Sequence, residues 1–271
     1  MPVRWNPAGA VTIVTGASSG IGRELSILLC EHGATVLAVA RRQDRLEALA
    51  AIAGKSLIPV VGDVTQKSVR QSTFARIDHS YDGRLDLLVN NAGAGAIGRF
   101  ETADPERARK LMELNYFAPL DWTRDALVPM RTTQSRLGID PMICNMGSVL
   151  GHRGVPEKSE YCASKFAIHG FSDSLRAELA SDRIGVTLVS PSRTESEFFE
   201  SLVDSDKDAK SIHLGAWTAK RVARATLSAI QSRRSEVILS MGGKALVYAD
   251  RLVPTVINAV MARLPSGFQD P

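Results

Sequence analysis

Short apolar runs alternate with longer amphipathic stretches along most of the chain. The runs are rich in Val, Ile and Leu, as in strands buried on both faces, and the stretches between them repeat apolar positions at helical spacing. The predicted strands cover residues 11–14, 35–39, 57–61, 85–89, 142–145, 186–189 and 237–239, and the predicted helices include 43–53, 66–79, 105–130 and 159–180. Strands separated by helices pair in parallel through right-handed crossovers rather than through hairpins. The pattern therefore predicts an α/β fold, a doubly wound parallel sheet of about seven strands with helices on both faces.

No stretch of the chain has the composition of an interdomain linker, so residues 1–271 are expected to form a single domain with its core at about 9–240. A short charged segment with apolar flanks predicts a substrate lid in region 190–220. Residues 241–271 are expected to form an apolar, helical C-terminal tail. Three alternatives stay open for this tail: it docks on another subunit, covers the pocket, or makes peripheral contact with a membrane surface.

Composition limits the class of protein. The 271 residues are 44% hydrophobic and 23% charged, which excludes a disordered or collagen-like chain. The formal charge of +4 is spread thinly, with basic clusters no longer than pairs, so we expect no nucleic-acid partner. Cys30, Cys144 and Cys162 have no metal-ligand spacing, so we expect no metal, and they fit a reducing, cytoplasmic location. We find neither a secretory signal nor the roughly 18 apolar residues of a transmembrane segment.

A glycine-rich octet, 15–22, follows the first predicted strand and opens the first helix. Gly16 permits a tight turn, Gly20 lets the backbone approach a pyrophosphate, and Gly22 permits close packing of the helix. The N–H groups at the start of such a helix bind anions. The residues expected to contact a dinucleotide here are Gly16, Ser18, Ser19, Gly20, Ile21 and Gly22.

This octet resembles that of the classical short-chain dehydrogenase/reductase family, and the resemblance extends from about Gly9 to Leu239. It implies a Rossmann-type dinucleotide-binding fold. It also implies contacts to the adenine from Asp63 and Val64, and contacts on the nicotinamide side from Asn90, Ala92 and Gly93. The alternative is structural: Asp63 caps the next helix, and Asn90 and Asn91 form a turn.

The end of the second strand distinguishes between NAD and NADP. A carboxylate at this place binds the ribose 2′-OH, whereas arginine neutralises a 2′-phosphate. Arg41 occupies the place of the acid and Arg42 follows it. The sequence therefore favours NADP(H), and the alternative is two solvated arginines at a helix start.

Tyr161 and Lys165 lie one turn apart on a predicted helix, and Ser148 directly follows the fifth strand. Oxidation or reduction at a hydroxyl carbon needs a proton acceptor or donor, and a nearby cation lowers the pKa of a phenol toward that use. In the resembled family these positions imply that Tyr161 is the acid/base and that Ser148 orients the substrate oxygen. Lys165 is then expected to bind the nicotinamide ribose and depress the tyrosine pKa, while Asn115 completes a proton relay.

The segment after the sixth strand departs from the family pattern of Pro-Gly followed by Thr. Ser192 replaces the glycine after Pro191, and Ser196 stands at the threonine position. We still expect cofactor contacts from Pro191, Thr194 and Ser196, with an altered backbone at Ser192 because serine adopts positive φ at greater cost than glycine.

These residues predict an NADP(H)-dependent oxidoreductase that interconverts a carbonyl, ketone or aldehyde, and an alcohol. The apolar flanks of the predicted lid suit a small-molecule substrate of apolar character. The alternatives are a catalytically silent NADP-binding regulatory or scaffold protein, and an epimerase or dehydratase of the same fold. The resemblance implies a homodimer or homotetramer.

Overall fold

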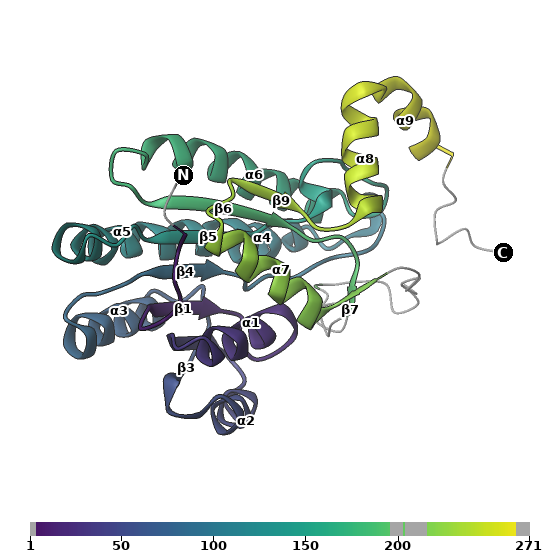
Figure 1. Ribbon diagram of the computed structural model, residues 1–271. Helices are drawn as coiled ribbons and strands as arrows, with labels where there is room; N and C mark the ends of the chain where they lie inside the picture. The colour runs from purple at the N-terminus through teal and green to yellow at the C-terminus, as the bar shows by residue number, and fades with distance from the viewer. Residues whose placement is uncertain (1–3, 196–202, 204–215, 264–271) are drawn as a thin grey trace.

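The computed structural model describes residues 4–195, 203 and 216–263. Its main sheet has seven parallel strands in the order β3-β2-β1-β4-β5-β6-β9 (Figure 1). The strands are β1 (Val11–Thr15), β2 (Thr35–Ala40), β3 (Leu57–Val61), β4 (Leu87–Asn90), β5 (Met142–Met146), β6 (Gly185–Ser190) and β9 (Glu236–Ile238). The predicted doubly wound, seven-stranded α/β fold is confirmed.

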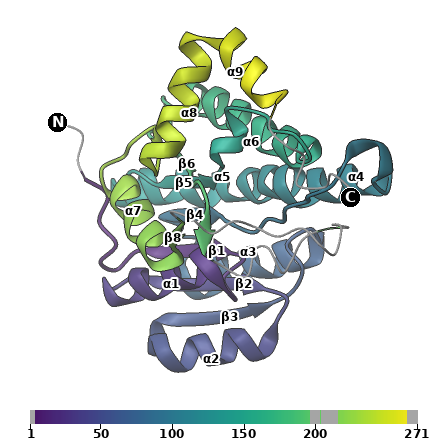
Figure 2. The ribbon, with the colours of Figure 1, turned by 90° about the vertical axis from the view of Figure 1, so that its right-hand side faces the viewer.

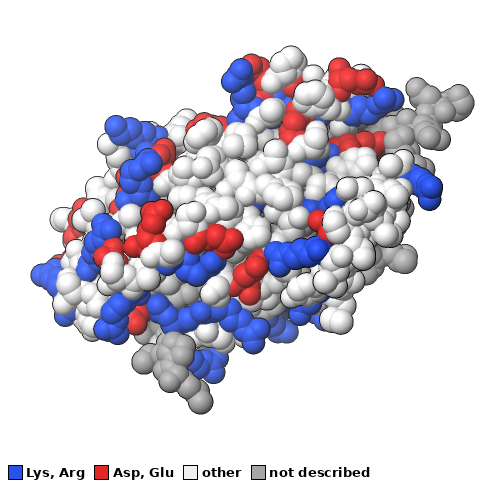
Figure 3. Space-filling model, turned by 90° about the horizontal axis from the view of Figure 1, so that it is seen from above, with Lys and Arg blue, Asp and Glu red and all other residues white. Residues whose placement is uncertain are grey.

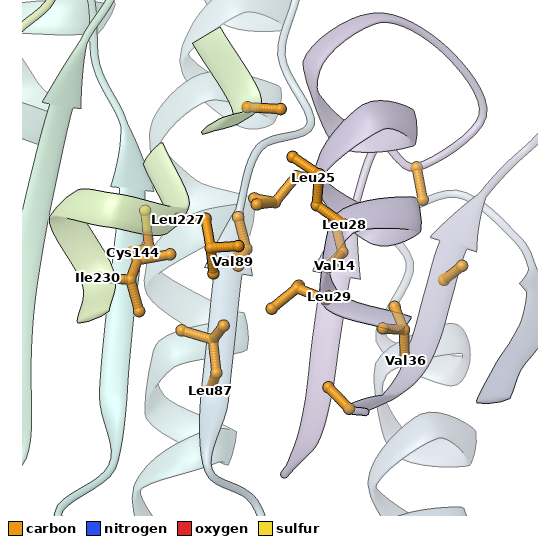
Figure 4. Close-up of a cluster of buried hydrophobic side chains, with 14 of the residues drawn as sticks. Val14, Leu25, Leu28, Leu29, Val36, Leu87, Val89, Cys144, Leu227 and Ile230 are labelled. Carbon is orange, nitrogen blue, oxygen red and sulfur yellow. The ribbon is translucent and has the colours of Figure 1, made fainter. Parts of the chain in front are cut away.

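Helices cover both faces of the sheet (Figure 2). One face carries α1 (Gly20–Glu31), α2 (Gln43–Ala53) and α7 (Ala219–Gln231), and the other carries α3 (Lys67–Tyr81), α5 (Ala118–Leu137) and α6 (Ser159–Glu178). Figure 4 shows the core of the first face, where Leu25 and Leu29 of α1 meet Leu227 and Ile230 of α7 over Val89. Each face buries large aliphatic side chains completely, and this burial is the main stabilising contribution of the fold.

Several short elements complete the chain. They are the 3-10 turns η1 (Gly54–Ser56), η2 (Phe100–Thr102) and η4 (Val149–Gly151), the helix α4 (Glu106–Met112), the π-helical segment η3 (Glu113–Phe117), and the two-stranded parallel sheet of β7 (Thr194–Glu195) and β8 (Trp217–Thr218). The helix expected at 105–130 is thus α4, η3 and α5 in succession, ending at Leu137. The small sheet was not predicted, because strands of two residues have no periodicity to detect. Most of region 190–220, including Ser196, lies outside the described residues.

The C-terminal tail contains α8 (Met241–Leu252) and α9 (Pro254–Met261), which project beyond the sheet (Figure 1). Val247 of α8 is buried against Val149 and Ile238. Six other apolar side chains of the tail are exposed: Met241, Tyr248, Leu252, Val253, Val256 and Val260. Within the described part of the chain, none of the helices has the length and apolar character to cross a membrane.

Charge is mixed on the face seen from above in Figure 3. Basic and acidic side chains lie interspersed there around a mainly uncharged centre. This distribution matches the thin spread of the net charge along the sequence.

Candidate active site

One cavity of about 1740 Å³ runs along the carboxyl ends of the parallel strands, where doubly wound sheets place their ligands. It exceeds the 300–1,000 Å³ of an ordinary small-molecule site, so it has room for a dinucleotide and a second molecule. Most of the residues expected from the sequence line it: Gly16, Ser18, Ser19, Gly20, Ile21, Arg41, Arg42, Asp63, Val64, Ala92, Gly93, Ser148, Tyr161, Lys165, Pro191 and Thr194. Gly22, Asn90 and Asn115 are not part of the lining.

The glycine-rich turn between β1 and α1 contains two residues with left-handed backbone. Gly16 has φ +67° and Gly20 has φ +55°, conformations that a residue with a Cβ adopts only at a cost. Within the described residues, no side chain caps the N-terminus of α1, and its first turn contains no acid. The N–H groups at this helix start are therefore suited to a phosphate anion.

Gly22 acts through packing rather than through ligand contact. An ideal Cβ at this position would lie 2.4 Å from Asn91 Nδ2 and 2.4 Å from the carbonyl oxygen of Gly16. The Asn91 amide donates to the carbonyls of Thr15 (2.9 Å) and Gly16 (3.2 Å). Asn91 therefore connects the loop after β4 to the glycine-rich turn through two hydrogen bonds, and the absence of a side chain at Gly22 leaves space for the Asn91 amide.

Asn90 lies beneath the cavity. It is 4% exposed, and its Nδ2 donates to Thr123 Oγ1 (3.1 Å) and Asn145 Oδ1 (2.8 Å), while Asn145 donates to Ser172 Oγ (2.9 Å). The Asn90 side chain therefore has a structural role in this network, and the expected cofactor contact from Asn90 stays a prediction. Successive side chains of a strand point to opposite faces, so Asn90 and Asn91 serve different sites.

The two arginines after β2 sit beside the glycine-rich turn. Arg42 Nη2 donates to Ser18 Oγ (3.1 Å) and Ser19 Oγ (2.7 Å). Arg41 Nη1 lies 3.9 Å from Asp63 Oδ2, and its side chain is 74% exposed. The Arg42 guanidinium and two hydroxyls thus gather at this turn, a donor set that suits a phosphate, and Arg41 lines the same cavity beside Asp63.

Asp63 itself takes part in a local turn. Its Oδ1 accepts from the N–H of Thr65 (2.9 Å) and from Thr65 Oγ1 (2.8 Å). The residue also lines the cavity, so the local hydrogen bonds and a ligand contact do not exclude each other.

Ser148, Tyr161 and Lys165 meet on the other side of the cavity. Ser148 follows β5, accepts from the N–H of Leu150 (3.1 Å) and hydrogen-bonds to the Tyr161 phenol. Lys165 Nζ lies 5.9 Å from the centre of the Tyr161 ring and donates to the carbonyl of Met146 (2.9 Å). A hydroxyl, a phenol and an ammonium are therefore placed together by β5 and α6.

Burial is the main cause of the pKa shifts of Tyr161 and Lys165. It raises the pKa of Tyr161 to about 12, against the smaller opposing effect of the Ser148 hydrogen bond, and it lowers the pKa of Lys165 to about 8. Desolvation of the phenol is the largest effect on the Tyr161 pKa, and the expected depression of this pKa by Lys165 stays a prediction. At neutral pH the phenol keeps its proton.

Asn115 lies in the π-helical segment, a deviation that often marks functional sites. It is 2% exposed, accepts from the N–H of Ala94 (2.9 Å) and donates to the Ala94 carbonyl (2.9 Å) and Ser164 Oγ (2.9 Å). An ideal Cβ on Gly93 would lie 3.0 Å from Asn115 Oδ1 and 3.7 Å from Lys165 Nζ. The side chain therefore fixes the loop after β4 next to Lys165, and its place in a proton relay stays a prediction.

Further residues of the site carried no recognisable sequence signal. Lys158 and Arg193 line the cavity, and the pKa of Lys158 is lowered by burial and by the nearby Arg193. Arg107 of α4 and Glu160 of α6 form a buried ion pair next to Tyr161. Arg107 and Arg193 lie far from Tyr161 in the sequence, so only the fold brings these two arginines to the site.

A family model described as short chain dehydrogenase matches residues 10–207. The chain belongs to the short-chain dehydrogenase/reductase family. It is an oxidoreductase by this membership, and the resemblance seen in its sequence is confirmed. An uncharacterized oxidoreductase of Bacillus subtilis, YxnA, is 30% identical over 94% of this chain and 72% of its own.

Solved structures of the family superpose closely. A short chain dehydrogenase from Burkholderia cenocepacia in complex with NADP has a TM-score of 0.80 at 26% identity, covering 94% of this chain and 98% of its own. A 3-ketoacyl-(acyl-carrier-protein) reductase from Brucella melitensis complexed with NADH has a TM-score of 0.77 at 24% identity, covering 87% and 98%. Members of this fold therefore bind either nicotinamide cofactor, so the residues of the site must decide between them.

Proposed function

We propose that this short-chain dehydrogenase/reductase uses NADP(H) to interconvert a carbonyl compound and an alcohol, with Tyr161 as the general acid/base. The observation that carries the proposal is a single cavity with a phosphate-suited turn at one end and Ser148, Tyr161 and Lys165 at the other. The cavity volume leaves room for a substrate beside a dinucleotide.

The residues present fit NADP(H). The start of α1 and Gly20 are suited to the pyrophosphate, and Arg41 and Arg42 to a 2′-phosphate. In this proposal Lys165 holds the nicotinamide ribose, and Lys165, Pro191 and Thr194 all line the cavity. Ser196, for which a contact was expected, lies outside the described residues. When bound, the nicotinamide supplies or accepts the hydride.

The chain's own groups supply the proton. The Ser148 hydroxyl donates to the substrate oxygen and holds it next to the phenol. Because Tyr161 keeps its proton at neutral pH, it is ready to donate that proton to the oxygen as negative charge develops there. Lys165, with a pKa of about 8, is largely protonated at pH 7 and stabilises the tyrosinate left behind.

Apolar residues suit an apolar substrate. Beyond the catalytic group the cavity is lined by Ala96, Ile97, Leu114, Leu150, Val155, Trp217 and Leu246. Burial of the carbon skeleton of a substrate against such a wall contributes about 25 cal/mol per Å².

Two measurements test the proposal. Purified protein is assayed with NADPH or NADH against a panel of ketones and aldehydes, with oxidation of the reduced cofactor followed by absorbance and products identified. We expect turnover with NADPH and an alcohol product. Product without net cofactor oxidation would indicate an epimerase or dehydratase, and tight NADPH binding without any product would favour the silent scaffold.

The cofactor preference has its own test. Arg42→Gln removes charge-assisted hydrogen bonds to a phosphate worth about 1.5–3 kcal/mol, so the Kd for NADPH should rise about 10- to 100-fold while that for NADH changes little. Arg109→Gln is the matched control, because Arg109 also lines the cavity but belongs to α4 rather than to the segment after β2. Equal losses for both cofactors in Arg42→Gln would remove the argument for NADP(H).

The oligomeric state, the cellular location and the role of the C-terminal tail remain predictions. We expect a homodimer or homotetramer and a cytoplasmic location, and peripheral membrane contact of the tail stays one of its three alternatives.

A further inference from the structure

Two histidines and a carboxylate converge outside the catalytic cavity. His152 follows η4, His169 lies in the middle of α6, and Glu236 begins β9, so three separate segments contribute one side chain each. One ligand-type atom from each of the three lies within 4.8 Å of the others. None of the three lines the catalytic cavity.

The separations match those between ligands of one metal ion. Bonds of about 2.0–2.1 Å in a tetrahedral zinc site place neighbouring N and O ligands about 3.3 Å apart. Here His152 Nε2 lies 3.0 Å from Glu236 Oε1, and His169 Nε2 lies 3.9 Å from the same oxygen. Asp173 Oδ2, one turn along α6, lies 3.4 Å from His169 Nε2 and is a candidate fourth ligand.

The hydrogen bonding of His169 orients it as a ligand. Its Nδ1 lies 3.2 Å from the Gly151 carbonyl, which can only accept, so Nδ1 carries the proton. With Nδ1 donating in this way, Nε2 of the neutral ring presents a lone pair toward Glu236 and Asp173. A backbone acceptor on the far nitrogen is a usual partner of a metal-bound histidine. A lone pair facing carboxylate oxygens is repulsive unless a metal ion or a proton lies between them.

His152 is the buried member of the group. Its side chain is 2% exposed, its Nε2 also lies 3.0 Å from Ser190 Oγ, and its Nδ1 has no hydrogen-bond partner among the described residues. The side chain of Glu236 is 30% exposed and that of Asp173 is 55% exposed, which gives an ion a path from solvent. The cluster therefore has a buried member, His152, and a partly exposed side at Glu236 and Asp173.

We propose that His152, His169 and Glu236 form a zinc site, with Asp173 or water as fourth ligand. Two imidazoles and carboxylate oxygen are a ligand set typical of Zn²⁺. Bound there, the ion joins β9 to the segment after Ser148 and to α6, the helix that carries Tyr161 and Lys165. Its role is structural, because the site is separate from the catalytic cavity.

Metal content tests the proposal directly. The full chain is stripped with a chelator, returned to buffer with Zn²⁺, and assayed for bound zinc and for Kd by competition with a chromogenic chelator. We expect one zinc per chain, and a rise in Tm of about 5 °C when free zinc is 100 times the Kd. His169→Gln and Glu236→Gln should abolish both effects, and Asp173→Asn separates a four-residue site from one completed by water.

His32→Gln is the matched control. His32 also places Nδ1 against a backbone carbonyl, that of Leu28 at 2.7 Å, but belongs to no such cluster. This variant should bind zinc as the parent does, and all variants are compared by circular dichroism and by Tm in chelator to show that they fold. No stoichiometric zinc on the parent chain, or equal zinc on His169→Gln and His32→Gln, would overturn the proposal and leave a protonated histidine pair facing carboxylates.

Discussion

Gly22→Ala tests the close packing between α1 and the loop after β4. The added Cβ would lie 2.4 Å from both Asn91 Nδ2 and the Gly16 carbonyl oxygen, far inside the 3.5–4.0 Å of favourable contact. Asn91 can rotate away, but it then loses two hydrogen bonds worth about 0.5–1.5 kcal/mol each. The Gly16 oxygen belongs to the backbone, so the remaining overlap strains the turn by about 1–3 kcal/mol. Alanine returns up to about 1 kcal/mol of helix propensity.

The net destabilisation is therefore roughly 3 kcal/mol, which for a chain of 271 residues corresponds to a fall in Tm of about 5 °C. Thermal unfolding followed by circular dichroism measures it, and NADPH titration should show weaker binding because the turn has moved. Gly170→Ala is the matched control: this glycine also lies in a helix, but a Cβ there meets nothing within 4 Å, so its Tm should stay equal or rise. A Gly22→Ala variant within about 2 °C of Gly170→Ala would refute the packing argument.

Three further predictions follow from buried polar groups. Because the pKa of Lys165 is lowered to about 8, the unfolded chain binds more protons than the folded chain between about pH 8 and 10, and the free energy of unfolding rises with pH there. In urea unfolding, Lys165→Met should lack roughly 2 kcal/mol of the rise that the parent shows between pH 8 and 9.5. Parallel curves of stability against pH for the two proteins would contradict this. Arg107→Ala leaves the Glu160 carboxylate buried without its partner and should lower the free energy of unfolding by about 3–5 kcal/mol. The double variant Arg107→Leu, Glu160→Leu should recover most of this loss. A double variant no more stable than Arg107→Ala would contradict a role of the ion pair. Asn90→Ala should destabilise the protein by about 1–3 kcal/mol, because it leaves Asn145 Oδ1 without this hydrogen bond. The Kd for NADPH should change little. A loss of cofactor binding without a loss of stability would instead support a direct contact between Asn90 and the cofactor.

The sheet could be predicted from the sequence because its strands are buried on both faces and read as continuous apolar runs. The glycine-rich turn and the Tyr161–Lys165 pair were also recognisable, since their chemistry is local and their spacing fixed. Helix ends were less certain: α5 extends to Leu137, where Gly138 adopts φ +66° and ends it.

Other features depend on three-dimensional placement. Neighbouring asparagines look equivalent in a sequence, yet Asn90 is buried in a polar network and Asn91 ties two loops together. The pKa of Tyr161 depends on the balance of burial and charge, which no spacing reveals. His152, His169 and Glu236 follow no motif, because three separate segments bring them together.

The central claim is that Tyr161 supplies the proton in a cavity that also holds NADPH. The most direct measurement is kcat/KM of Tyr161→Phe with the best carbonyl substrate, alongside the Kd for NADPH. The account predicts a loss of about 10²- to 10⁴-fold in kcat/KM while the Kd stays within about twofold, because the phenol hydroxyl acts in proton transfer. Turnover within about threefold of the parent enzyme, with NADPH bound equally well, would contradict it.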